Sequence, residues 1–70
     1  DPNYADAWIN KGSALYELGM YHDAIAAYDQ AIRINPQSSN AWRRKGYALK
    51  KLDLDKEAKE AFSRAEELGY

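Results

Sequence analysis

Apolar residues recur at steps of three and four residues along four stretches of the chain, with polar residues between them. Two sets show this in the first half: Trp8, Gly12, Leu15 and Leu18, and then, after a break, Ala24, Ala27, Tyr28 and Ala31. This spacing follows the helical period of about 3.6 residues and predicts amphipathic helices. The chain is therefore expected to be all-α, with helices at about residues 4–18, 22–34, 39–52 and 56–68.

Residues that end or begin helices lie between these stretches. Gly19 can end a helix in the left-handed conformation, and Pro36 stops the second helix because proline cannot continue it. Ser38 and Asp55 are of the residue types that cap helix N-termini. We expect them to cap the third and fourth helices.

The second half of the chain repeats the first at an offset of 34 residues, as Trp8 and Trp42 show (42 minus 8). Laying residues 5–38 over residues 39–70 gives ten identities: Ala7/Ala41, Trp8/Trp42, Lys11/Lys45, Gly12/Gly46, Ala14/Ala48, Leu15/Leu49, Leu18/Leu52, Ala24/Ala58, Ala27/Ala61 and Ala31/Ala65. A fixed period of this length indicates a repeat architecture in which each unit is a pair of helices.

Small residues at equivalent places predict how the two helices of each pair meet. A glycine inside a helix costs about 1 kcal/mol relative to alanine, so its use at the same place in both copies indicates close packing. We expect small residues at the crossings and aromatic residues in the gaps: Gly12 with Ala24, Gly46 with Ala58, and around them Trp8, Tyr28, Trp42 and Phe62.

These residues resemble the tetratricopeptide repeat family, whose unit of about 34 residues has the pattern W-x2-L-G-x2-Y, A-x3-F, A, P. The first copy matches with Trp8, Gly12, Tyr21, Ala24, Tyr28, Ala31 and Pro36, and the second with Trp42, Gly46, Ala58, Phe62 and Ala65. Both copies depart from the pattern in places, at Lys11, Leu15, Lys45, Leu49, Asp53, Asp55 and Tyr70. The resemblance implies two tandem helix-turn-helix hairpins, four antiparallel helices and a right-handed superhelical segment of an α-solenoid.

The repeat frame divides the chain into residues 1–4, the tail of a preceding repeat, and two repeats at 5–38 and 39–70. Ile25 and Ile32, expected to cover the following repeat, become Lys59 and Glu66 in the second copy. A terminal repeat needs such a polar outer face, so we expect the second repeat to be a C-terminal capping repeat. Alternatively a further capping helix follows, and Leu68 and Tyr70 are apolar surface awaiting it.

The resemblance also implies a concave groove lined by the first helix of each pair. The positions expected there are Ile9, Asn10, Ser13, Tyr16, Asn40, Arg43, Arg44, Tyr47, Lys50 and Lys51. Residues 1–36 carry two basic and five acidic groups, whereas residues 37–70 carry eight basic and six acidic groups. Because arginine binds carboxylates with two hydrogen bonds, the groove predicts an acidic peptide or protein partner. The alternative is that these cations form a solvated basic face that binds no partner.

A narrower form of this hypothesis is a clamp for a C-terminal carboxylate. In family members that bind chaperone tails, Asn and then Arg at the places of Asn10 and Arg44 help to hold that group. Asn40 stands where those proteins usually have Lys, so the match is partial.

Other classes of function fit less well. The chain has no cysteine and one histidine, His22, which we expect to be exposed, so we expect no metal, no other cofactor and no catalysis. No apolar run approaches the roughly 18 residues that span a membrane, and the expected location is cytoplasmic.

Two binding alternatives remain. The cluster of Arg43, Arg44 and Lys45 favours nucleic acid, but Trp42 is expected to be buried and the acidic first repeat would repel a phosphate backbone. Self-association is the other: Tyr4, Ile9 and Trp8 form a face through which copies could stack end to end or swap helices.

Overall fold

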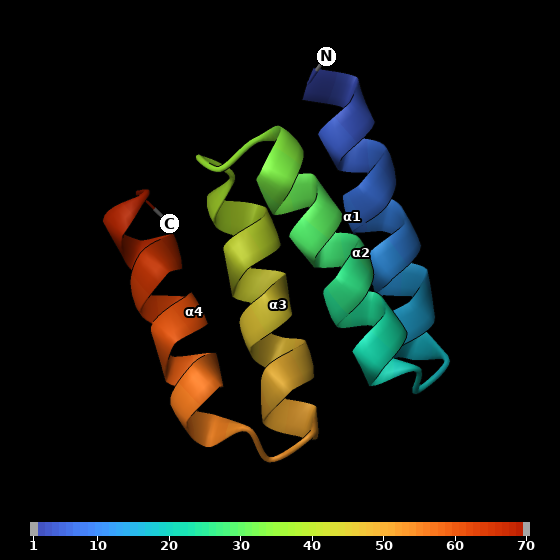
Figure 1. The fold of residues 1–70 in the computed structure, drawn as a ribbon, viewed down its shortest axis with the longest axis vertical. Coiled ribbons are helices and arrows are strands. Elements are labelled where there is room, and N and C mark those ends of the chain that lie inside the picture. Colours follow the sequence, from blue (N-terminus) through green and yellow to red (C-terminus); the bar gives the residue numbers. More distant parts are fainter. Residues whose placement is uncertain (1, 70) are drawn as a thin grey trace.

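The computed structural model describes residues 2–69, and these residues form four helices joined by short turns (Figure 1). The helices are α1 (Pro2–Glu17), α2 (Tyr21–Ile34), α3 (Ser39–Lys51) and α4 (Asp55–Glu67). The predicted all-α fold of two helical hairpins is confirmed. α1 begins at Pro2, where proline is favoured in a first turn, so residues 2–4 are continuous with the first helix.

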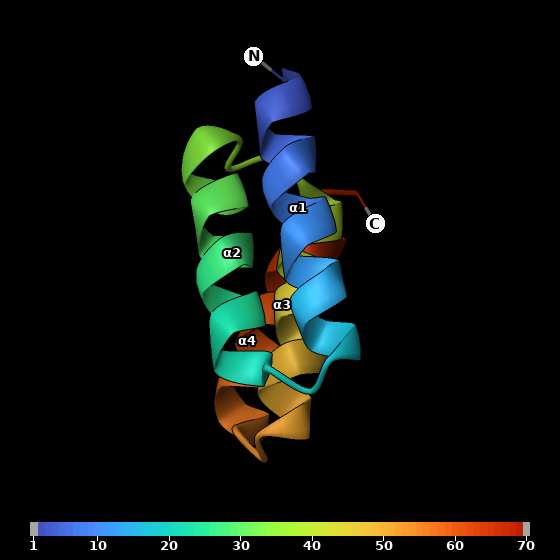
Figure 2. The ribbon, with the colours of Figure 1, turned by 90° about the vertical axis from the view of Figure 1, so that its right-hand side faces the viewer.

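The four helices pack as two hairpins that lie side by side. α1 packs against α2 and α3 against α4, while α2 joins the hairpins by packing against α3, and α1 touches α3 only slightly. Two views at right angles show α2 in front of α1, on the side of the molecule that faces the viewer in Figure 1 (Figure 2). The molecule is therefore a slab of 32 × 27 × 15 Å, with α2 at the centre of its packing.

The core consists mainly of alanines, which lets the helix axes approach closely. Its buried apolar residues are Ala5, Ile9, Ala24, Ala27, Tyr28, Ala31, Ala41, Ala48, Leu49, Ala58, Ala61 and Ala65. Among these, the predicted inner face of α2 is confirmed at all four positions. Ile25 packs against both the cluster around Tyr28 and the cluster around Leu49, so one side chain links the two repeats.

Three expectations about burial are wrong. Leu18 is 73% exposed because α1 ends at Glu17 and Leu18 lies in the turn. Trp42 is half-buried, and its indole Nε1–H donates to the carbonyl oxygen of Pro36 at 3.2 Å. Ile9 is only 5% exposed and belongs to the core cluster of Tyr28.

The mid-helix glycines make room for aromatic rings, as the sequence predicted for Tyr28 and Phe62. A Cβ atom on Gly12 would lie 2.5 Å from Cε1 of Tyr28, and one on Gly46 would lie 2.8 Å from Cε1 of Phe62. The ring edges of the second helix in each hairpin therefore rest on the glycine backbone of the first. The expectation of close helix packing is confirmed, and two of the four expected aromatic residues, Tyr28 and Phe62, lie against the glycines.

The turns after α1 and α3 use different residues in the same left-handed backbone conformation. Gly19 has φ +77°, which confirms the left-handed conformation expected after α1, and Asp53 takes φ +61° at the equivalent place. Ser38 caps α3 as predicted, because its Oγ accepts from the Ala41 N–H at 3.3 Å. The prediction for Asp55 is wrong: it is the first residue of α4, and Leu54 is the N-cap. The Asp55 carboxylate instead lies in the first turn of α4, where it interacts favourably with the positive end of the helix dipole.

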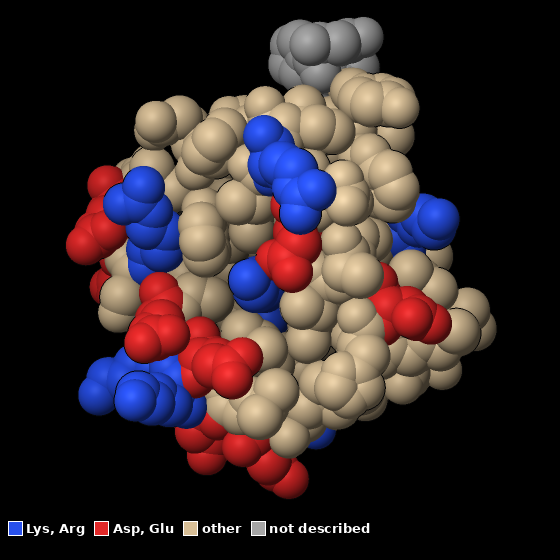
Figure 3. Space-filling view, viewed as in Figure 1, with Lys and Arg blue, Asp and Glu red and all other residues tan. Residues whose placement is uncertain are grey.

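The outer side of α4 is polar. Lys59 and Glu66 are exposed there. Their equivalents on α2, Ile25 and Ile32, are half-buried and pack against the core cluster. On the face seen in Figure 1, acidic and basic side chains are interspersed (Figure 3). The capping role of the second repeat remains a prediction, and its Tyr70 lies outside the described residues. Within residues 2–69 no helix has the length and apolarity that crossing a membrane requires.

Candidate functional site

A pocket of about 280 Å³ lies where three helices from both repeats meet, and we call it the Arg44 pocket. Tyr16 of α1, Tyr28 of α2, and Arg44 and Tyr47 of α3 line it. Tyr16, Arg44 and Tyr47 were predicted as site residues from the sequence. Tyr28 was missed because its spacing marks it as core, which it also is: it is 1% exposed.

Arg44 is held in place by neutral oxygen atoms. Its Nε donates to Oδ1 of Asn40 at 3.0 Å, and its Nη1 donates to Oγ of Ser13 at 3.1 Å. Ser13 Oγ also lies 3.3 Å from the hydroxyl oxygen of Tyr28. Among the described residues no carboxylate pairs with this half-buried guanidinium, so its charge is positioned but not compensated.

Asn40 orients two arginines at once. Its Oδ1 accepts from Nη2 of Arg43 at 3.0 Å as well as from Nε of Arg44. These bonds span three and four residues of one helix, which is the spacing at which side chains on a helix meet. Asn40 therefore acts on the site through the arginines, and its amide oxygen is already occupied.

The tyrosines of the pocket differ in exposure. Tyr47 is 46% exposed, and its ring meets Phe62 edge to face at a centroid distance of 5.1 Å. Tyr16 packs in the same manner against Tyr21 at 5.3 Å. Tyr28 is fixed in the core. The pocket thus has three aromatic walls, one deeply buried and two nearer the surface, which suits an apolar group beside an anion.

The remaining predicted site residues do not all gather here. Asn10, Lys50 and Lys51 are exposed, and Lys50 lines a separate hollow between α3 and α4 that also holds Glu66. The prediction of Ile9 as a site residue is wrong. Ile9 is a core residue with 5% of its surface exposed, so it offers almost no area to a partner.

The charge of α3 has one sign, and only part of it is neutralised. The helix carries five cations and no acid: Arg43, Arg44, Lys45, Lys50 and Lys51. The charge of Lys45 is neutralised by an ion pair, since its Nζ lies 2.7 Å from Oδ1 of Asp29 on α2. Lys50 and Lys51 lie in the last turn, where cations also stabilise the helix dipole, so their presence alone does not indicate a ligand.

No group of three or more His, Cys, Asp or Glu residues in 2–69 is placed to hold an ion. His22 is exposed on α2. The arrangement is suited to holding an anionic group through hydrogen bonds and charge.

Comparison with known proteins gives two matches to family models. Both models describe the tetratricopeptide repeat, one at residues 5–38 and the other at residues 39–68. Together they cover nearly all of the chain. A comparison with curated proteins found no match. Tetratricopeptide repeats generally mediate protein–protein interactions, and the family is typically non-catalytic.

Proposed function

We propose that this chain, which belongs to the tetratricopeptide repeat family, is an interaction module that binds an acidic peptide or protein segment at the Arg44 pocket, without catalysis. The observation that carries the proposal is the uncompensated guanidinium of Arg44. Ser13 and Asn40 hold it in place, and a partner's carboxylate supplies the missing negative charge. The segment lies across both repeats because the pocket takes side chains from both.

The surroundings of Arg44 support a carboxylate beside an apolar side chain. A fixed arginine loses little freedom when it binds, and charge-assisted hydrogen bonds are the stronger kind. Tyr16 and Tyr47 supply aromatic surface next to it. Lys50 and Lys51 are exposed further along α3, and they add attraction for acidic residues that flank the one in the pocket.

Affinity is expected to be modest. A two-repeat surface offers less than the roughly 800 Å² per partner of a standard interface, so we expect dissociation constants in the micromolar range or weaker. Charge disfavours nucleic acid as the main partner. A phosphate backbone that crossed both repeats would meet Asp6 and Glu17 at exposed positions of α1 and be repelled.

The test is an NMR titration of ¹⁵N-labelled protein with a short acidic peptide that carries one aromatic residue. We expect shifts at Ser13, Arg44 and Tyr47. Arg44→Gln is expected to raise the dissociation constant by about tenfold or more, since a hydrogen bond to a charged group contributes about 1.5–3 kcal/mol. Arg33→Gln is the matched control, because Arg33 is an exposed arginine of α2 that does not line the pocket.

Two comparisons make the outcome decisive. Equal weakening by Arg44→Gln and Arg33→Gln would mean that only net charge matters, and the pocket proposal would be wrong. The same peptide with an amidated C-terminus separates the two kinds of carboxylate: unchanged binding assigns the pocket to an acidic side chain, and lost binding assigns it to the chain terminus, with Asn10 then expected to shift as well.

A further inference from the structure

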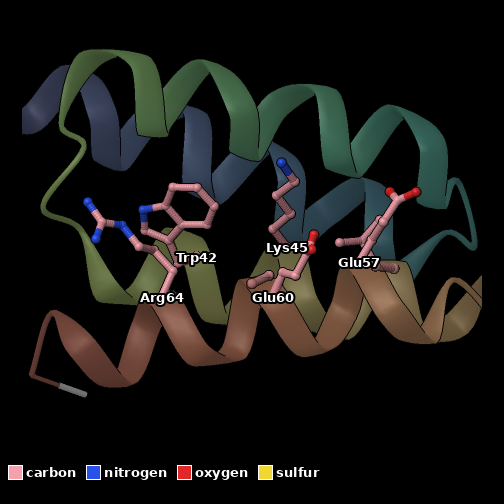
Figure 4. Close-up of a pocket in the computed structure, with 7 residues that line it drawn as sticks. Trp42, Lys45, Glu57, Glu60 and Arg64 are labelled. Atoms are coloured by element: carbon pink, nitrogen blue, oxygen red, sulfur yellow. The ribbon is translucent and has the colours of Figure 1, made fainter.

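A hollow of about 430 Å³ lies between α3 and α4, and we call it the Trp42 hollow (Figure 4). Trp42 and Lys45 line it from α3, and Lys45 extends from there toward α2, where its Nζ meets Asp29. Two residues along a helix turn a side chain by about 200 degrees, so Trp42 lies on nearly the opposite side of α3 from Arg44. The Trp42 hollow is therefore separate from the Arg44 pocket, and no residue lines both.

The most buried residues of the hollow are apolar. Leu49 and Ala61 line it and are 3% and 2% exposed. Trp42 is half-buried beside them, and its indole Nε1–H is already bonded to the carbonyl oxygen of Pro36. The indole ring therefore offers aromatic surface, and not its N–H group, to a ligand.

The two cations that line the hollow are already paired. Lys45 Nζ lies 2.7 Å from Oδ1 of Asp29. Arg64 Nη1 lies 3.1 Å from Oε1 of Glu67, one turn further along α4. Neither cation is left to neutralise another acid of the hollow.

The two glutamates of the hollow have no such partner. Glu57 and Glu60 are exposed, and among the described residues neither makes an ion pair, although Lys56 lies one turn before Glu60. In Figure 4 both side chains extend from α4 in the direction of α2. Glu57 also stabilises the dipole of α4 from its first turn, but Glu60 lies in the second turn and gains little from it. Two negative charges thus remain beside an apolar hollow.

We propose that the Trp42 hollow binds a basic segment of a partner protein by taking in one arginine side chain. The methylene stem of the arginine packs on Trp42, Leu49 and Ala61. Its guanidinium pairs with Glu57 and Glu60 at the rim. Long cationic side chains combine an apolar stem with a charged head in this manner, and a guanidinium also stacks on an indole ring.

The arrangement of the carboxylates favours arginine over lysine. Glu57 and Glu60 are three residues apart on α4, which is a spacing at which side chains on a helix are neighbours. The five donors of a guanidinium can pair with both carboxylates, whereas an ammonium group is a compact point charge. An acidic segment would be repelled here, so this site and the Arg44 pocket select ligands of opposite charge. The site does not depend on the proposed function.

The probe is a peptide in which arginine alternates with glycine, acetylated and amidated so that only the arginines carry charge. Binding is followed by the indole N–H resonances in ¹⁵N spectra. We expect the Trp42 resonance to shift with a dissociation constant on the order of 1 mM, because one side chain buries little surface. The Trp8 resonance should move less, since Asp23 and Ala26 line its hollow at the places of Glu57 and Glu60. A probe with citrulline, which has nearly the shape of arginine without its charge, is expected not to bind.

Removing the two carboxylates tests the pairing. The double variant Glu57→Gln with Glu60→Gln is expected to raise the dissociation constant about tenfold, the effect of two exposed ion pairs. The matched control is Asp6→Asn with Glu17→Gln, which removes the same charge from exposed positions of α1 that do not line the hollow. We expect the control to change the dissociation constant by less than about twofold, because salt screens charges that are far from the ligand.

Four outcomes would each overturn the proposal. They are no shift of Trp42 at a probe concentration about tenfold above the expected dissociation constant, an equal shift with the citrulline probe, a shift of Trp8 as large as that of Trp42, and equal weakening by the two double variants. Circular dichroism of each variant verifies that it is folded. The acidic-peptide titration is read at the Arg44 pocket, so the failure of one proposal is distinguished from the failure of the other.

Discussion

Replacing Gly12 by alanine sets two opposing effects against each other, and the structure decides which is larger. Alanine favours the helix by about 1 kcal/mol over glycine. The new methyl group, however, would lie 2.5, 2.8 and 3.0 Å from three carbon atoms of the Tyr28 ring. These distances are too short for carbon atoms in contact, so the ring or the helix must move.

The Tyr28 ring has little room to move. It is 1% exposed, and its hydroxyl lies 3.3 Å from Ser13 Oγ on the same helix as Gly12. Overpacking a core costs about 1–3 kcal/mol and occasionally more, and this rigid site is expected at the upper end. After the gain in helix propensity, the net destabilisation expected for Gly12→Ala is about 2 kcal/mol. At Gly46 the clash is milder, at 2.8–2.9 Å from a half-buried Phe62, and the expected net cost is below about 1 kcal/mol.

Urea unfolding followed by circular dichroism measures both variants against the parent chain. Ala26→Gly, at an exposed position of α2, is the control for propensity alone and should cost about 1 kcal/mol. The reasoning is refuted if Gly12→Ala is as stable as the parent, or if Gly46→Ala is the more damaging of the two.

Three further substitutions test single contacts. Ser38→Ala removes the α3 cap and should lower the free energy of unfolding by about 1 kcal/mol in the same urea experiment; no change would mean that the bond to Ala41 is not formed in solution. Asp29→Asn breaks the pair with Lys45 and should cost less than about 1 kcal/mol, with a loss that shrinks in high salt; a cost independent of salt would contradict an ionic origin. Asp53→Gly removes the strain of a non-glycine residue in the left-handed conformation and should stabilise the fold by about 0.5 kcal/mol, seen as a slightly higher melting temperature. A lower melting temperature would show that the aspartate side chain stabilises the turn.

The candidate site was only partly predictable. Tyr16, Arg44 and Tyr47 follow from their place beside the repeat frame, because side chains three and four residues apart share a side of a helix. Ile9 satisfies the same spacing but lies in the core, since α1 meets both α2 and the cluster that contains Ala41. Tyr28 was missed for the opposite reason: its ring is buried, yet its edge borders the pocket.

Lys45 shows how a departure from the family pattern, shared with Lys11, acquires a physical role in the folded chain. Both stand where the pattern has leucine, and the sequence offers no reason for it. In the folded chain Lys45 pairs with Asp29 across the boundary between repeats, 16 residues away (45 minus 29). Lys45 thus contributes an ion pair between the two hairpins.

The amino-acid sequence alone determined the number of helices, their approximate ends and their pairing into two repeats. These features depend on periodicity, on glycine and proline at the turns, and on a 34-residue offset, all of which are local or repeated. Only the tertiary structure decided which charges are compensated. Arg44 meets Ser13 across 31 residues and Lys45 meets Asp29, although the two cations are neighbours in the chain. A step of one residue turns a helical side chain by about 100 degrees, so the packing of α2 between α1 and α3 separates their environments.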